Sequence, residues 1–325
     1  MSNRKSLLGG GLSMVLHNKR YIAWFYVLNL FLGLFGTVAF VNQAGSILDH
    51  SLQSDRLVHG FSLSVLFEMF ARPEFGPTIA SRGPAMFFAL LFFALTALFL
   101  PGVFQGYAST YRLPRDDFFR ACGRNLWRFI RLMIVAGIVM GIVAGLLFAL
   151  NGAIVKKAGE STNELLGFEL NMTGLFVIFL IMTTLRIWFD LAEADIVLDD
   201  QRAVRKSIGT AFRHTFRSLG RLLASYVVSA IGAAIVLVGG IWWWMRFVPP
   251  TSVMGAFLVS QFILLLLLVP RFWQRGVAVS YWKQYMMVPV AAVVEPVMPP
   301  AVPSPVAEKP PSPFVPVTPA DAPSS

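Results

Sequence analysis

The chain has 325 residues, of which 56% are hydrophobic and only 14% are charged. A soluble domain carries about 25% charged residues, so this composition excludes an ordinary soluble protein. The formal net charge is +10 without a nucleic-acid-binding motif beside it, and a single cysteine, Cys122, leaves no intramolecular disulfide and no cysteine metal cluster. We therefore expect no metal, no cofactor and no nucleic-acid partner.

Six apolar runs define the expected fold in chain order. Each is close to the ~20 residues that a helix needs to cross the hydrocarbon core, which predicts an all-α, polytopic membrane helix bundle over residues 1–288. The expected spans are residues 21–42, 85–106, 132–150, 172–189, 222–247 and 254–272. The first run is longer than the core of a signal peptide, which indicates an uncleaved first span.

Basic residues are distributed unevenly between the two ends of these spans. Twenty of the 27 Lys and Arg residues lie before the first span, shortly after the last one, or in the second and fourth connections, and the remaining connections hold six. Because positive residues stay in the cytoplasm, we expect both termini of this multi-pass protein to be cytoplasmic. In the long first connection, residues 43–83, the helical spacing of Leu63, Leu66, Phe67 and Phe70 predicts an amphipathic surface helix.

The chain repeats itself at an offset of 93 residues. The segment FRACGRNLWRFIRLMIVAGIVMGI (119–142) aligns with FRHTFRSLGRLLASYVVSAIGAAI (212–235), with eight identities in 24 positions. We interpret this as two parallel helical hairpins, spans 2–3 and spans 4–5, flanked by spans 1 and 6.

Each copy of the repeat carries basic residues on one helical face and apolar residues on the other. In the segment 202–219, which leads into the second copy, the apolar face holds Val204, Ile208, Ala211, Phe212 and Leu219. Such helices are expected to lie in the membrane plane, where each basic residue near an anionic leaflet adds about 1 kcal/mol of attraction. The candidate contacts with anionic phospholipid headgroups are Arg120, Arg124, Arg128, Arg202, Arg205, Lys206, Arg213 and Arg217. The alternative is that these residues only fix the topology.

Small residues recur every four positions in the third span, at Gly137, Gly141 and Gly145. Such spacing lets helix backbones approach closely in lipid. We expect these glycines to form the contact between spans 3 and 5, with a dimer interface as the alternative.

The segment 190–200 holds five carboxylates, Asp190, Glu193, Asp195, Asp199 and Asp200. On a helix that continues the fourth span, Asp190 and Glu193 share a face with Arg186, whereas the other acids point elsewhere. Hard cations need several oxygens at one point, so we predict a structural elbow rather than a metal site. In this elbow Arg186 pairs with Asp190 or Glu193, and the remaining acids cap the next helix.

The last segment, residues 289–325, holds 12 of the 20 prolines. Proline at this density predicts a disordered, proline-rich cytoplasmic tail. The tail is either a solvated segment or a docking strip for a protein partner that recognises proline.

Several short motifs carry a resemblance that covers residues 1–288. They are a basic N-terminal helix, DRLVHGF in the first connection, FLPGV at the end of the second span, and DIVLDD before a basic amphipathic helix. This pattern resembles uncharacterised bacterial six-helix integral membrane proteins and, more loosely, the membrane domain fused to some glycerophosphodiester phosphodiesterases. The resemblance implies the membrane fold and a location in a bacterial inner membrane. The catalytic domain of those enzymes has no counterpart here, so no catalytic residue is implied.

The polar residues of the spans indicate the class of function. No ionisable residue lies near the centre of an expected span, and the chain contains no G-x-S-x-G, H-E-x-x-H or P-loop motif. We therefore expect a non-enzymatic integral membrane protein that organises anionic lipid or protein partners. The alternative is a permease-like component that handles an apolar or lipidic solute.

Overall fold

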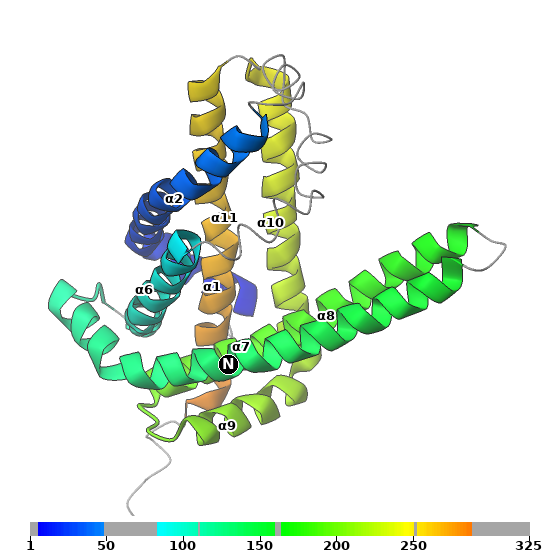
Figure 1. Cartoon of the computed structure of the whole chain (residues 1–325). Helices are drawn as coiled ribbons and strands as arrows, with labels where there is room; N and C mark the ends of the chain where they lie inside the picture. The colour runs from blue at the N-terminus through cyan, green and yellow to red at the C-terminus, as the bar shows by residue number, and fades with distance from the viewer. Residues whose placement is uncertain (1–5, 49–82, 110, 160–163, 250–251, 288–325) are drawn as a thin grey trace, which may run out of the picture. The chain divides into compact units, whose positions relative to one another are not determined.

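The computed structural model describes residues 6–48, 83–109, 111–159, 164–249 and 252–287. In these ranges the chain forms helices and short connections, and no strand (Figure 1). The described residues belong to the unit Met1–Met287, and Val288–Ser325 form a second unit. The helices are α1 (Leu7–His17), α2 (Lys19–Leu48), α6 (Gly83–Ala108), α7 (Arg115–Gly159), α8 (Glu164–Leu198), α9 (Val204–Arg217), α10 (Leu219–Phe247) and α11 (Val253–Tyr281), which continues into the π-helical turn η1 (Trp282–Met286). The all-α prediction is confirmed.

Five of the described helices are long and apolar enough to cross a membrane. They are Met86–Ala108, Arg115–Gly159, Leu165–Leu198, Leu219–Phe247 and Val253–Met286, and each corresponds to one of the expected spans. The remaining expected span, residues 21–42, lies within the 30-residue helix α2. The predicted surface helix around residues 63–70 and the proline-rich tail lie outside the described residues.

The two copies of the repeat fold differently at their basic ends. The first copy is part of α7, an unbroken helix of 45 residues, about 68 Å at 1.5 Å per residue. The second copy breaks at Ser218, whose backbone N–H bonds to the carbonyls of His214 and Thr215 and ends α9. The aligned residue, Asn125, lies within the unbroken α7, where it is buried and its Nδ2 donates to the Ala121 carbonyl one turn back. The expectation of a separate in-plane helix in the first copy is therefore wrong.

Glycines set the closest helix contacts, beginning with α1 against α11. A Cβ added to Gly276 would stand 2.6 Å from the carbonyl oxygen of Gly11, and one added to Gly11 would stand 2.7 Å from the backbone nitrogen of Val277. The two backbones therefore touch, and Trp273 Nε1 donates to the Leu8 carbonyl at 2.9 Å beside the crossing. This contact fixes α1, a helix too short to span the membrane, to the end of α11.

A second close contact lies where α6 meets α7 and α2. A Cβ on Gly102 would meet Phe118 at 2.5 Å and Cys122 at 2.7 Å, and one on Gly106 would overlap the ring of Tyr21. Gly102 and Gly106 are four positions apart, so this is a small-residue helix contact of the kind expected in lipid.

The predicted glycine contact in α7 is not formed. A Cβ added to Gly137, Gly141 or Gly145 would meet no atom within 4 Å, and all three positions are exposed. The expected packing between spans 3 and 5 is therefore wrong. Instead, two small residues of the aligned span α10, Ser225 and Ser229, are buried, and α10 contacts α8 and α11.

Two clusters of buried apolar side chains fill the interior. One joins the start of α2, the end of α6 and the start of α7, and includes Phe104 and Phe129. The other joins the ends of α8 and α11 with α9 and the start of α10, and includes Leu191 and Tyr226. Helix α11 contributes to both clusters, with Phe272 in the first and Val277 in the second. Both clusters therefore gather around the end of the bundle that carries most of the basic residues.

Candidate functional site

The acidic end of α8 lies inside the bundle rather than at its wet surface. Residues 189–197 are buried without a break, because α9, α10 and α11 all contact α8. Asp190, Glu193 and Asp195 are between 5% and 8% exposed, whereas Asp199 and Asp200 are exposed. Sequence reasoning placed all five carboxylates in one elbow, but the structure divides them into three buried and two exposed groups.

Asp190 is held by partners on two helices. The Tyr226 hydroxyl of α10 donates to Asp190 Oδ2 at 2.8 Å, and Arg186 Nε lies 3.8 Å from the same oxygen. The predicted pairing of Arg186 with Asp190 is confirmed. A buried carboxylate is costly unless it is paired and hydrogen-bonded, and these two contacts provide that compensation.

Glu193 lies one helical turn further along α8. The charges of Asp190, Arg275 and Arg186 all act on it, and Arg275 of α11 is itself only 6% exposed. Glu193 Oε2 accepts no hydrogen bond from the residues that the structure describes. We call Arg186, Asp190, Glu193, Tyr226 and Arg275 the buried polar cluster, and it joins α8, α10 and α11.

The expected capping of α9 by the remaining acids is wrong. The N-cap of α9 is Ala203, which makes no side-chain capping hydrogen bond. Asp195 is buried and faces Ser207 in the first turn of α9, because α9 folds back onto α8. Asp199 instead accepts a hydrogen bond from the Gln201 side chain at 2.8 Å.

Asp200 connects the two basic segments of the repeat. Its Oδ1 accepts a hydrogen bond from Arg128 Nη1 of α7 at 2.6 Å, and Arg124 and Arg202 add positive charge nearby. The hydrogen bond from Arg128 is the largest cause that lowers the pKa of the Asp200 carboxyl below its ordinary value. The backbone of Asp200 has φ 48°, a left-handed conformation that Asp tolerates better than most residues, and it turns the chain from α8 towards α9.

One face of α9 is fixed to the bundle. Ser207, Ala211 and Thr215 are spaced by four residues and are completely buried. Trp188 Nε1 donates to the Ile208 carbonyl at 2.8 Å, and the Tyr281 hydroxyl donates to Ser218 Oγ, just past the helix, at 3.0 Å. The inner face therefore consists of small residues that let α9 lie close to α8 and to the end of α11.

The outer face of α9 carries its charges. Arg205, Lys206, Arg213 and Arg217 are exposed, and no ion pair to an acid holds any of them among the described residues. Burial, followed by the charges of Arg217 and Arg213, lowers the pKa of His214 at the edge of this face. His214 is therefore mostly neutral at neutral pH, and the arginines and the lysine supply the positive charge.

Exposed aromatic rings border the basic face. Phe212 and Phe216 are 46% and 53% exposed, their ring centroids lie 4.5 Å apart, and Phe212 packs edge-to-face on Trp188. The expected apolar face of α9 is thus divided. Val204, Ile208 and Ala211 turn towards the bundle, whereas Phe212 remains outside beside the cations. Aromatic rings next to basic residues are typical of membrane–water interfaces.

The basic residues of α7 have different surroundings. Arg120 is highly exposed and lies 3.8 Å from Asp117, and Arg124 is exposed. Arg128 is only 21% exposed at its side chain because it pairs with Asp200. Seven of the eight predicted headgroup contacts are therefore exposed, and Arg128 serves as a link between helices.

Sequence reasoning missed the residues that position these groups. Tyr226 and Arg275 complete the buried polar cluster, and Trp188 and Tyr281 anchor α9. Tyr226 could have been found from the sequence, because a polar aromatic residue between the small residues of an apolar span indicates a buried hydrogen bond. Arg275 lies four positions after Arg271 near the end of the last span, and this spacing also marks one helical face.

Taken together, the helices define a multi-pass α-helical membrane protein with a basic, aromatic face at one end of its bundle. No group of three or more His, Cys, Asp and Glu residues that could hold a metal ion occurs in the described part of the chain. Comparisons of the chain with protein-family models, curated proteins and solved structures find no match.

Proposed function

We propose that the protein is a non-enzymatic integral membrane protein that binds anionic phospholipid headgroups at the basic face of α9 and thereby organises lipid around its bundle. We place it in a bacterial inner membrane, with both termini and α9 on the cytoplasmic side. The proline-rich tail would then be available to a cytoplasmic protein partner.

One observation carries this proposal. The inner face of α9 is fixed by Trp188 and Tyr281, so its outer face is a rigid platform rather than a mobile segment. That platform presents four cations, Arg205, Lys206, Arg213 and Arg217, beside exposed phenylalanine rings.

In this mechanism the basic residues contact the lipid headgroups and the aromatic rings contact the acyl chains. Phosphate oxygens accept hydrogen bonds from guanidinium groups, and each basic residue near an anionic leaflet contributes about 1 kcal/mol of attraction. Phe212 and Phe216 place apolar surface at the boundary between headgroups and acyl chains. The transmembrane helices hold the protein in the bilayer in any case, so the basic face selects which lipids surround it.

The test compares two double variants of the full-length protein in nanodiscs that contain phosphatidylglycerol and phosphatidylcholine. Changing Arg213 and Arg217 together to Gln should remove about 2 kcal/mol of attraction, on the order of 30-fold in relative affinity for phosphatidylglycerol. Changing both to Lys keeps the charge and should preserve most of the preference. Native mass spectrometry of the bound lipids measures the ratio, and added salt should reduce it.

If the Gln variant retains the same preference for phosphatidylglycerol as the Lys variant, the arginines only fix the topology and the proposal fails. A permease-like role for an apolar or lipidic solute is the second candidate, and an apolar groove described below favours it. Translocation of a fluorescent phospholipid by the protein in liposomes, above the rate in protein-free vesicles, would support that candidate over ours.

A further inference from the structure

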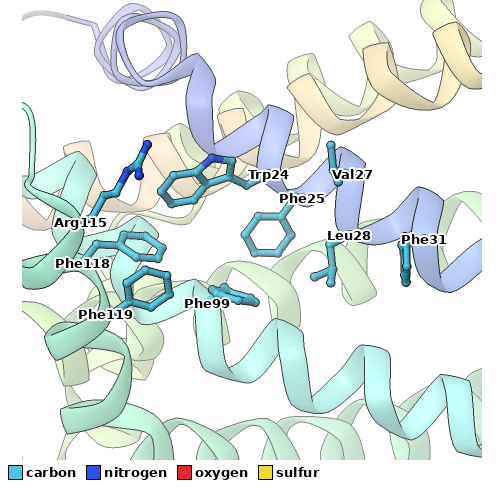
Figure 2. Close-up of a pocket in the computed structure, with 9 residues that line it drawn as sticks. All are labelled: Trp24, Phe25, Val27, Leu28, Phe31, Phe99, Arg115, Phe118 and Phe119. Atoms are coloured by element: carbon cyan, nitrogen blue, oxygen red, sulfur yellow. The ribbon is translucent and has the colours of Figure 1, made fainter.

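An apolar groove lies between α2, α6 and the first turns of α7. Its volume is about 610 Å³, and Figure 2 shows Arg115 beside Trp24 at one end and Phe31 at the other, with Leu28 and Phe99 between them. The groove is a separate site from the basic face of α9, because none of its lining residues belongs to α8, α9 or α10.

The groove begins beside the basic first turns of α2 and α7 and extends into the apolar part of the bundle. Trp24 lies in the second turn of α2, Phe99 lies in the second half of α6, and Arg115 is the first residue of α7. From Trp24 to Phe31 the helix rises about 10 Å at 1.5 Å per residue. That is about two-thirds of the ~15 Å depth of hydrocarbon in one leaflet.

The side of the groove that faces away from the bundle is open and apolar. Trp24, Phe31 and Phe119 are 37%, 62% and 54% exposed. In a bilayer these side chains would face acyl chains, so an elongated apolar ligand can enter from the side without crossing a polar barrier.

Positive charge is concentrated at one end of the groove. Arg115 has no hydrogen bond or ion pair with any residue that the structure describes, and it is exposed. Arg20 lies nearby, since its guanidinium stands 6.0 Å from the Trp24 ring and donates to the Leu113 carbonyl at 2.6 Å. The nearest acids in sequence are Asp116 and Asp117, and Asp117 faces Arg120 rather than Arg115.

A groove with one cationic end and an aliphatic and aromatic remainder matches a ligand with one anionic end and a hydrocarbon chain. We propose that it binds a single anionic phospholipid, with the phosphate at Arg115 and one acyl chain along Leu28, Phe99 and Phe31. This inference rests on the proposed lipid-binding function and adds to it a site that selects for an acyl chain as well as a headgroup.

The experiment uses the full-length protein in nanodiscs with a trace of phosphatidylglycerol that carries a photoreactive diazirine within an acyl chain. After illumination, mass spectrometry of the digested protein locates the crosslinked residues. We expect crosslinks to be enriched at residues 27–31 and 99 relative to Ile138, an exposed residue of α7 outside the groove.

Two variants with matched controls test the two ends of the groove. Leu28→Trp fills the apolar part and should lower these crosslinks at least fivefold, whereas Ile138→Trp adds the same side chain elsewhere and should leave them unchanged. Arg115→Gln should lower the preference for photoreactive phosphatidylglycerol over phosphatidylcholine about fivefold, the equivalent of about 1 kcal/mol for one basic residue. Arg112→Gln removes a nearby charge that does not line the groove and should have no such effect.

The outcomes separate this inference from the proposed function. Crosslinks that are no denser in the groove than at Ile138, or that persist in folded Leu28→Trp, would show only the ordinary lipid layer and overturn the inference. Arg115→Gln lies on the surface and tests the headgroup end even if Leu28→Trp fails to fold; an unchanged lipid preference in it would also overturn the inference. The change of both Arg213 and Arg217 to Gln separates the two proposals. If the groove crosslinks and the headgroup preference are both unchanged in that variant, the groove remains a lipid site and headgroup binding at the basic face of α9 is rejected.

Discussion

At the scale of single residues, a glycine matters in this protein where another helix crosses it. Gly276 and Gly11 let the backbones of α11 and α1 touch, whereas a Cβ added to Gly141, in the GxxxGxxxG stretch of α7, would meet no atom within 4 Å. The same residue type therefore has opposite roles, and the position of the partner helix decides between them.

Gly276→Ala should destabilise the protein by about 1–3 kcal/mol, because a methyl group would be forced against the Gly11 carbonyl and neither backbone can yield easily. Gly141→Ala is the matched control and should leave stability unchanged or slightly raised, since Ala favours a helix over Gly. Thermal unfolding in detergent micelles measures both. Equal midpoints for the two variants would show that α1 is not fixed to α11 at this crossing.

The hydroxyl of Tyr226 is the donor that makes burial of Asp190 tolerable. Tyr226→Phe keeps the ring and removes the 2.8 Å hydrogen bond, which should cost about 1–3 kcal/mol because the carboxylate stays buried. Tyr111→Phe, at an exposed ring, should cost nothing measurable. Chemical unfolding in micelles compares the two, and a Tyr226→Phe protein as stable as the parent would mean that Asp190 does not need this donor.

At the scale of elements, hydrophobic runs predicted the helices well and their contacts poorly. The long apolar segments were found from sequence because a membrane helix must satisfy its backbone hydrogen bonds internally, and this leaves a strong local signal. The burial of Asp190 and Glu193 could not be predicted in the same way, because it depends on Tyr226 and Arg275, which come from distant helices. The pairing of Arg186 with Asp190 was predictable because both residues lie on one helix, four positions apart.

The turn between α8 and α9 depends on the pair of Arg128 and Asp200. The pKa of Asp200 is lowered in the folded protein, so the folded state binds fewer protons at this group than the unfolded state does. The stability from the pair is thus present above the ordinary pKa of about 3.9 and is lost as the pH falls through the lowered folded value.

Asp200 is 51% exposed at its side chain, so solvent screens the pair and its contribution should be at most about 1 kcal/mol. The stability difference between the parent protein and Arg128→Gln should therefore be small at about pH 6 and disappear towards about pH 2. Arg120→Gln, which removes a much more exposed charge, serves as the control. A difference for Arg128→Gln that grows on acidification would contradict this account of the turn.

At the scale of the whole molecule, the distribution of buried and exposed surface indicates what surrounds the protein. Only 11% of the most apolar window of α7 and 6% of that of α8 is buried, against 39% for α6. Apolar surface of that extent must be covered by lipid or by another protein chain. The buried polar cluster and the fixed face of α9, by contrast, lie together at the end of the bundle with most of the basic residues. Buried contacts therefore join the helices mainly at the basic end of the bundle, and α7 and α8 extend from that end with their apolar sides exposed.

The orientation of this basic end can be tested by labelling introduced cysteines, because the chain's own cysteine should not react. Cys122 is 1% exposed, so a membrane-impermeant maleimide should not label the parent protein in intact cells. Because positive residues stay in the cytoplasm, cysteines introduced as Lys157→Cys and Ser252→Cys should be labelled from outside. Cysteines introduced as Arg115→Cys and Arg205→Cys should be labelled only after the membrane is permeabilised. External labelling of Arg205→Cys would place α9 on the outer leaflet and reverse the orientation on which the proposed headgroup binding is based.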